Sequence, residues 1–155
     1  MRHRAYIGIG SNLGDAVANV GNAIAALGDL GAVDRASSLY RTKPWGKADQ
    51  PDFVNAVVLL DTALDPRGLL AALKALEVRL GRVPSERWGP RSIDLDILTF
   101  DDLHLEEEGL TIPHAGLLER AFVLVPLAEI DASFVGARGA LSEDELASCR
   151  PERSA

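Results

Sequence analysis

The first third of the chain alternates short apolar runs with a helical repeat. Arg4–Ser11 is rich in β-branched and aromatic residues and leads into a Gly- and Asn-containing turn, which predicts a strand. Asp15–Leu30 carries apolar residues at every third or fourth position, which predicts a helix with Asp15 at its N-terminal end and Gly31 at its C-cap. Val33–Tyr40 has the composition of a second strand.

The same alternation continues through residue 100. Phe53–Leu60 predicts a strand, and Ser92–Phe100 predicts a further strand. Between them, the apolar repeat of Leu69–Leu80 predicts a helix with Pro66 in its first turn that ends at Gly81. The order β-α-β-β-α-β is typical of the ferredoxin-like α+β fold, in which an antiparallel sheet carries both helices on one face.

Weaker patterns follow this core. Leu117–Ile130 is mostly apolar and is expected to be helical at least in part despite Pro126, as a C-terminal addition to the fold. Ser142 and Glu145 have the spacing of a capping box, which predicts one short helix followed by a frayed end. We expect one domain spanning 1–155, with a core at about 4–135 and a tail at 136–155.

Composition narrows the class of protein. The 155 residues are 47% hydrophobic and carry a net charge of −7, which fits one acidic globular domain and disfavours a general nucleic-acid-binding surface. Cys149 is the only cysteine, so neither an internal disulfide nor a cysteine-rich zinc site is expected.

No segment of the sequence resembles a membrane anchor. The apolar run Ala5–Gly10 follows a basic N-terminus, but Asn12 and Asp15 end it too early for a secretion signal. No later stretch reaches the ~18 consecutive apolar residues of a membrane span. We therefore expect a cytoplasmic protein without membrane contacts.

Two carboxylates lie within the last predicted strand. Alternate residues of a strand share a face, so Asp94 and Asp96 are expected about 7 Å apart on one side while Ile93, Leu95 and Ile97 point into the core. Carboxylates at this spacing can share Mg²⁺ ions that also bind phosphate oxygens. The alternative is a half-exposed strand with a polar outer face.

A basic stretch directly precedes the carboxylates. Arg79–Arg91 contains four Arg and one Glu, a local charge of +3 in an acidic chain. Together with a metal, such a stretch suits a bound polyphosphate. The alternative is a solvated loop that pairs with the acidic run Asp101–Glu108.

Four other residues are candidates for ligand contact. Trp45 and Trp88 lie in Pro- and Gly-containing loops. Two roles are open for each: stacking on a planar ligand, or covering the edge of the core. Asn55 lies on one strand face with Phe53, where its amide meets a heterocycle or bonds to an adjacent loop. His114 is a phosphate ligand or a turn residue.

Familiar nucleotide-binding motifs do not match. The chain has no P-loop consensus. Gly8 and Gly10 lie at the end of the first predicted strand and Gly14 in the turn after it, but their spacing is one residue longer than the dinucleotide fingerprint requires. A dinucleotide site is therefore not expected.

Taken together, these segments resemble the 6-hydroxymethyl-7,8-dihydropterin pyrophosphokinase family. The resemblance covers about Ala5 to Ile130 and rests mainly on the segment Arg87-Trp88-Gly89-Pro90-Arg91-Ser92-Ile93-Asp94-Leu95-Asp96-Ile97-Leu98. Further matching segments are Ala5–Gly14, Ser38–Thr42, Asp49–Ala56, Gly81-Arg82, Thr111–His114 and Arg120–Phe122.

This resemblance implies an enzyme of folate biosynthesis that transfers pyrophosphate from ATP to the pterin hydroxymethyl group and releases AMP. It implies a monomer whose partners are these two small molecules, and two Mg²⁺ ions held by Asp94 and Asp96. The implied residues that contact the transferring phosphates are Arg82 and Arg91. The remaining implied residues are, for ATP, Glu77, Trp88, Ile97, Thr111, His114 and Arg120, and, for the pterin, Thr42, Lys43, Trp45, Phe53, Asn55, Trp88 and Phe122.

One position departs from the family pattern, because Pro84 stands where many members have a basic residue and the loop around it is one residue short. Two other function classes remain open: a module that binds pterin or nucleotide without catalysis, and a metal-dependent phosphohydrolase. The nucleotide product formed from ATP separates these alternatives from a pyrophosphokinase.

Overall fold

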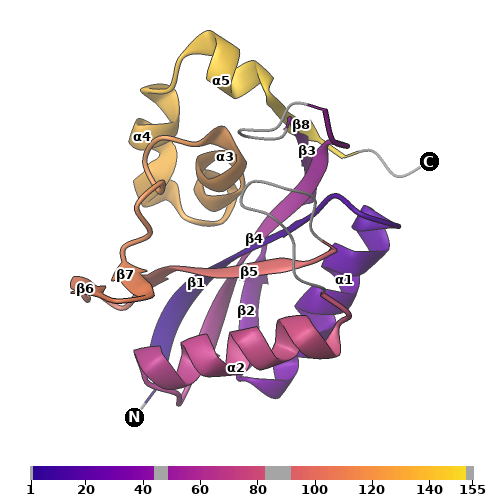
Figure 1. Cartoon of the computed structure of the whole chain (residues 1–155). Coiled ribbons are helices and arrows are strands. Elements are labelled where there is room, and N and C mark those ends of the chain that lie inside the picture. Colours follow the sequence, from indigo (N-terminus) through magenta and orange to yellow (C-terminus); the bar gives the residue numbers. More distant parts are fainter. Residues whose placement is uncertain (1, 44–48, 83–91, 153–155) are drawn as a thin grey trace.

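A computed structural model describes residues 2–43, 49–82 and 92–152 of the chain (Figure 1). The strands are β1 (His3–Ser11), β2 (Ala32–Ala36), β3 (Tyr40–Thr42), β4 (Phe53–Thr62), β5 (Asp94–Phe100), β6 (Leu105–Glu107), β7 (Leu110–Ile112) and β8 (Cys149–Pro151). The helices are α1 (Ala16–Ala26), α2 (Pro66–Arg79), α3 (Ala121–Ile130), α4 (Val135–Gly139) and α5 (Glu143–Ala147), with short 3₁₀ turns at Leu27–Asp29 and Ala132–Phe134.

The main sheet has the expected topology. Its order is β5-β1-β4-β3-β8, with β2 also pairing with β4, and every pairing is antiparallel. β4 lies between β1 and β2, which flank α1, and β1 lies between β4 and β5, which flank α2, as in a split βαβ arrangement. The predicted ferredoxin-like α+β fold is confirmed.

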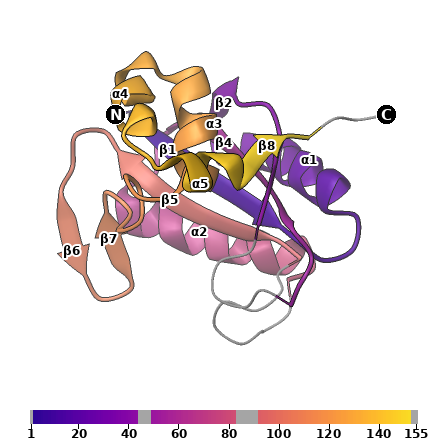
Figure 2. The ribbon, with the colours of Figure 1, turned by 90° about the horizontal axis from the view of Figure 1, so that it is seen from above.

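Helices cover both faces of this sheet. α1 and α2 pack on one face over the larger apolar cluster, which includes Val20, Leu73 and Leu95. α3 packs on the other face through Val123 and Leu127 (Figure 1). The β6–β7 hairpin projects from the side of the domain in the view of Figure 2. Leu98 of β5 packs in the same cluster as α3, and alternate residues of a strand share a face, so Asp94 and Asp96 lie on the sheet face under α3.

The predicted second strand is wrong in one respect, because Val33–Tyr40 is not continuous. β2 ends at Ala36 and β3 begins at Tyr40. At the break, the Ser37 amide donates to the Val57 carbonyl at 2.8 Å, and Ser37 Oγ accepts from the Val57 amide at 2.9 Å. The serine hydroxyl replaces a strand carbonyl at this point, which a composition-based prediction does not detect.

The predicted role of Gly31 as a helix cap is also wrong. α1 passes into a 3₁₀ turn, and Gly31 is absent from the glycines with positive φ in the described residues. A Cβ at Gly31 would lie 2.2 Å from the backbone oxygen of Asp61, so the position needs glycine because β4 passes too close for a side chain.

The C-terminal tail is more ordered than predicted. Ser142 caps α5 as expected, accepting from the Glu145 amide at 3.1 Å. The expected fraying does not occur at residues 149–151, because β8 pairs with β3. The described part of the tail therefore continues the main sheet by one strand.

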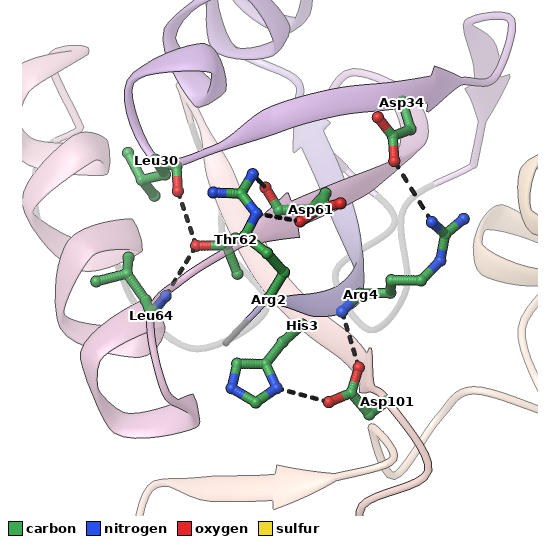
Figure 3. Close-up of polar contacts among 9 residues, drawn as sticks. All are labelled: Arg2, His3, Arg4, Leu30, Asp34, Asp61, Thr62, Leu64 and Asp101. Atoms are coloured by element: carbon green, nitrogen blue, oxygen red, sulfur yellow. Dashed lines mark hydrogen bonds and ion pairs between the residues drawn. The ribbon is translucent and has the colours of Figure 1, made fainter.

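A polar cluster fastens the end of β1 that is remote from Ser11 (Figure 3). Asp101 accepts a hydrogen bond from the Arg4 amide at 2.8 Å and pairs with Nδ1 of His3 at 2.7 Å. The bond from the Arg4 amide is the main cause that holds the pKa of Asp101 below its ordinary value. These contacts stabilise the left-handed backbone of Asp101, whose φ is 48°.

Among the described residues, no helix combines the length and the hydropathy that crossing a bilayer requires.

Candidate active site

Two glycines of β1 form the floor of a cavity on the α3 side of the sheet. Gly10 lies between Asn55 of β4 and Asp94 of β5 in one cross-strand row, and Gly8 lies beside Asp96 in the next row. All five residues line the cavity. Because neither glycine has a side chain, the surface of the sheet is recessed between Asn55 on β4 and the two carboxylates on β5.

This hollow depends on Gly10 in particular. A Cβ at Gly10 would lie 2.7 Å from Oδ1 of Asn55. Neighbouring strands lie about 4.8 Å apart, so Asn55 and Asp94, two strands apart, are separated by about 10 Å across the floor. The two ends of the cavity can therefore meet two different chemical groups of bound substrates.

The two carboxylates share one side of β5, as their spacing predicts. Asp94 and Asp96 both line the cavity, whereas Ile93, Leu95 and Ile97 are buried in the core. Removal of Asp96 from water, with the charge of Asp94 adding to it, raises the pKa of Asp96 above its ordinary value. A cation would relieve this repulsion.

The donor set suits a cation that is shared with a substrate. Among the described residues, no group of three or more His, Cys, Asp and Glu side chains is arranged to hold an ion. A pair of carboxylates supplies hard oxygen ligands but leaves most of an octahedral Mg²⁺ shell to water and phosphate oxygens. The residues present therefore fit Mg²⁺ bound together with a polyphosphate.

Behind the carboxylates lies an ion pair between the buried Glu77 and the partly buried Arg82. Glu77 of α2 is only 2% exposed; its Oε1 lies 2.9 Å from Nη1 of Arg82, and its Oε2 accepts from the Leu95 amide at 2.7 Å. The same Nη1 donates to Oδ1 of Asp94 at 3.2 Å. Glu77 is not among the described residues that line the two cavities, so it contacts the site through Arg82 and β5.

The opposite wall comes from α3 and the segment before it. His114, Arg120 and Phe122 line the cavity, and the Arg120 guanidinium carbon lies 5.7 Å from the centre of the Phe122 ring. Burial, with a smaller contribution from Arg120, holds the pKa of His114 below its ordinary value. His114 is therefore held mainly neutral near pH 7, and its Nδ1 accepts from the Gly116 amide at 3.1 Å.

The end of the cavity at Asn55, here called the amide end, is lined by four of the candidates for pterin contact, Thr42, Lys43, Phe53 and Asn55. Nδ2 of Asn55 donates to Oγ1 of Thr42 at 2.6 Å, and both side chains are almost fully buried. Lys43 and Phe53 line the same cavity.

A second cavity adjoins the carboxylates. Ile97, Thr111 and His114 line it together with Asp96, which also lines the first cavity. Sequence reasoning missed Lys74, which lines this second cavity and places Nζ 3.6 Å from Oε1 of Glu77. Its position one helical turn before Glu77 was the available signal.

Three expected site residues, Trp45, Trp88 and Arg91, lie outside the described residues, as does Pro84. The other expected site residues gather around the two cavities or, in the case of Glu77 and Arg82, directly behind the carboxylates.

Comparisons with known proteins point to one enzyme family. A family model described as 7,8-dihydro-6-hydroxymethylpterin-pyrophosphokinase (HPPK) matches residues 6–132. A 2-amino-4-hydroxy-6-hydroxymethyldihydropteridine pyrophosphokinase of Methylorubrum extorquens is 48% identical over 135 residues, which is 85% of each chain. The protein of the same name from Bacillus subtilis is 46% identical over 132 residues, covering 84% of this chain and 79% of the relative.

Solved structures support the fold. A Plasmodium falciparum HPPK-DHPS structure with pteroate matches with a TM-score of 0.66 and 17% identity, covering 83% of this chain. This chain spans only 39% of that longer one, so the match concerns the domain's architecture.

Proposed function

Because the chain belongs to the 7,8-dihydro-6-hydroxymethylpterin-pyrophosphokinase family, we propose that its two adjoining cavities hold the pterin and ATP on either side of Asp94 and Asp96. The chain transfers pyrophosphate from ATP to the hydroxymethyl group of 6-hydroxymethyl-7,8-dihydropterin, giving the pterin diphosphate and AMP in folate biosynthesis. The observation that carries the placement is the row of Asn55, Gly10 and Asp94 across three strands.

In the reaction, the hydroxymethyl oxygen attacks the β-phosphorus of ATP and its proton is released to solvent. The bond between the β-phosphorus and the α,β-bridging oxygen breaks, and AMP leaves with that oxygen. Asp94 and Asp96 are the residues that would hold two Mg²⁺ ions, and Mg²⁺ would supply neutralisation of the phosphate charge there. Such a transfer depends chiefly on positioning and charge neutralisation, so the protein needs no covalent nucleophile.

Cationic and polar side chains of this chain would hold the triphosphate. We assign Arg82, with Arg91, to the transferring phosphates, and His114 and Arg120 to the rest of the triphosphate. The ion pair with Glu77 supports this role, because it fixes the Arg82 guanidinium beside Asp94. The adenosine would lie in the second cavity. That cavity's proposed contacts for ATP are Lys74, Ile97 and Thr111, with Trp88.

The pterin would occupy the amide end of the first cavity. With one amide hydrogen directed to Thr42, the Asn55 side chain still has a second N–H and a carbonyl oxygen to pair with the ring edge. Phe53 of β4 and Phe122 of α3 both line this cavity, and each would offer a ring for stacking. Lys43 and Trp45 complete the proposed set, with Trp45 closing over the ring.

Several wider properties are also proposals. We propose that the chain is one domain, with a core at about 4–135 and a tail at 136–155, and acts as a cytoplasmic monomer. We propose that it binds neither nucleic acid nor membranes, a reading supported by its net charge of −7.

The assignment of the pterin end is tested by Asn55→Ala. Removing the amide is expected to lower kcat/KM for the pterin about 100-fold, because the loss of hydrogen bonds to a buried ring edge costs about 2–3 kcal/mol. The dissociation constant for ATP should stay unchanged, since Asn55 lies at the end of the cavity remote from the carboxylates. Steady-state kinetics with each substrate varied, together with calorimetric titration of ATP, measure both quantities.

Asn22→Ala is the matched control, because Asn22 is an exposed amide on α1. It should leave both constants unchanged. An Asn55→Ala protein with unaltered kcat/KM for the pterin would exclude the assignment.

A further inference from the structure

The start of α3 needs a hydrogen-bond acceptor that its own sequence does not provide. The first turn of any helix leaves backbone N–H groups without partners inside the helix. The N-cap position of α3 is Arg120, whose cationic side chain has donors only and cannot accept from that turn. Arg120 and Phe122, on either side of Ala121, both line the substrate cavity.

Glu145 of α5 supplies the missing acceptor. The Ala121 amide donates to Oε1 of Glu145 at 2.9 Å, across 24 positions of sequence. In a capping box, a Glu three residues after Ser142 would turn back to the Ser142 amide. Here Ser142 makes its half of the motif with the Glu145 amide, while the Glu145 carboxylate caps α3 instead. A negative charge is also favourable at that helix end.

Ser148 and Cys149, which directly follow α5, contact a second wall of the cavity, at β3. In the pairing of β8 with β3, Cys149 lies opposite Thr42. The Lys43 amide donates to the Ser148 carbonyl at 3.2 Å. Thr42, Lys43 and Phe122 all line the cavity. The segment from α5 to β8 therefore contacts both α3 and β3, which carry these residues or lie next to them (Figure 1).

We propose that Glu145 is a positioning residue for pterin binding, because its hydrogen bond to the Ala121 amide fixes the turn that carries Phe122 and Arg120. The proposal rests on the proposed function of the cavity. It extends the working site beyond the 6–132 range that matches the family model.

The test compares Glu145→Ala, Glu145→Gln and the control Glu143→Ala, which changes an exposed carboxylate of the same short helix. In Glu145→Ala, KM for the pterin should rise about fivefold or more with kcat changed less, as expected for the loss of one hydrogen bond that orients a binding wall. In Glu145→Gln, a carbonyl oxygen remains to accept the same bond, so KM should return close to that of the unmodified chain.

Amide hydrogen exchange at Ala121 gives a readout that does not depend on catalysis. Exchange should accelerate about fivefold or more in Glu145→Ala and stay unchanged in Glu145→Gln and Glu143→Ala. Unchanged KM in Glu145→Ala, an equal rise in Glu143→Ala, or no recovery in Glu145→Gln would overturn the proposal. Absence of pterin-dependent AMP from the unmodified chain would instead overturn the proposed function, so the two failures are distinguishable.

Discussion

Replacing Asp96 with Asn is expected to lower kcat about a thousand-fold and, at the same time, to raise the thermal midpoint of the metal-free protein. The amide keeps the shape of the side chain but removes the charge of a metal ligand. Loss of several kcal/mol of charge neutralisation in the transition state corresponds to about three powers of ten in rate.

The gain in stability follows from the environment of Asp96. Burial raises the pKa of Asp96, the charges of Asp94 and Glu77 act in the same direction, and Lys74 and Arg82 oppose them. The unfolded chain ionises this carboxyl near its ordinary pKa of 3.8, while the folded chain holds the proton to higher pH. The stability of the metal-free protein therefore falls as pH rises from that value through the raised pKa.

Asn carries no titrating proton and escapes this loss. At mildly alkaline pH, the midpoint of the Asp96→Asn protein should rise by roughly 4 °C, whereas below pH ~4 the two proteins should melt alike. Melting curves in chelator and AMP formation at saturating Mg²⁺ measure the two effects. Asp102→Asn, at an exposed position just after β5, is the control and should change neither. Retained turnover at saturating Mg²⁺ would contradict the metal assignment. A lowered midpoint at alkaline pH would contradict the destabilising effect of the Asp96 charge.

Replacing Glu77 with Ala is expected to destabilise the protein by about 3 kcal/mol and to lower kcat strongly, although Glu77 does not line the described cavities. Removing the buried carboxylate leaves the groups that it accepts from without an acceptor in the protein interior. Here the Leu95 amide and the Arg82 guanidinium each lose an acceptor. Arg82 then loses its fixed position beside Asp94, so catalysis falls together with stability.

The surface pair between Arg79 and Asp29 provides the comparison for Glu77. It joins α2 to the turn after α1 with a 3.0 Å contact, but its side chains are 61% and 70% exposed. Arg79→Ala should cost less than about 0.5 kcal/mol, because exposed ion pairs contribute little. Urea denaturation gives both free energies of unfolding. Equal losses for Glu77→Ala and Arg79→Ala would contradict the predicted contribution of Glu77 to stability. An unchanged kcat in Glu77→Ala, measured as AMP formation, would refute its positioning role.

Local sequence patterns were sufficient to predict those helices and strands whose apolar residues follow one regular spacing, as in β5 and α2. The alternation around Leu95 placed Asp94 and Asp96 on one face because side chains alternate strictly along a strand. The apolar repeat and Pro66 in the first turn likewise predicted α2, which begins at Pro66.

Features that depend on which residues of neighbouring strands lie opposite each other could not be predicted from local sequence patterns. Gly8 and Gly10 looked like an imperfect nucleotide-binding loop, and only the pairing of β1 with β4 and β5 shows that they hollow the sheet between Asn55 and Asp94. The tail strand β8 is three residues long and contains Pro151, so its composition gave no signal. Its place is set by backbone pairing with β3, which is distant in sequence.

The most direct test of the account identifies the adenine nucleotide that the purified chain forms from ATP with and without 6-hydroxymethyl-7,8-dihydropterin, in the presence of Mg²⁺. We expect AMP in equal amount to the pterin diphosphate, and AMP formation only when the pterin is present. Formation of ADP, or release of phosphate without the pterin, would contradict it and would favour a metal-dependent phosphohydrolase. Absence of any nucleotide product would also contradict it and would leave a binding module.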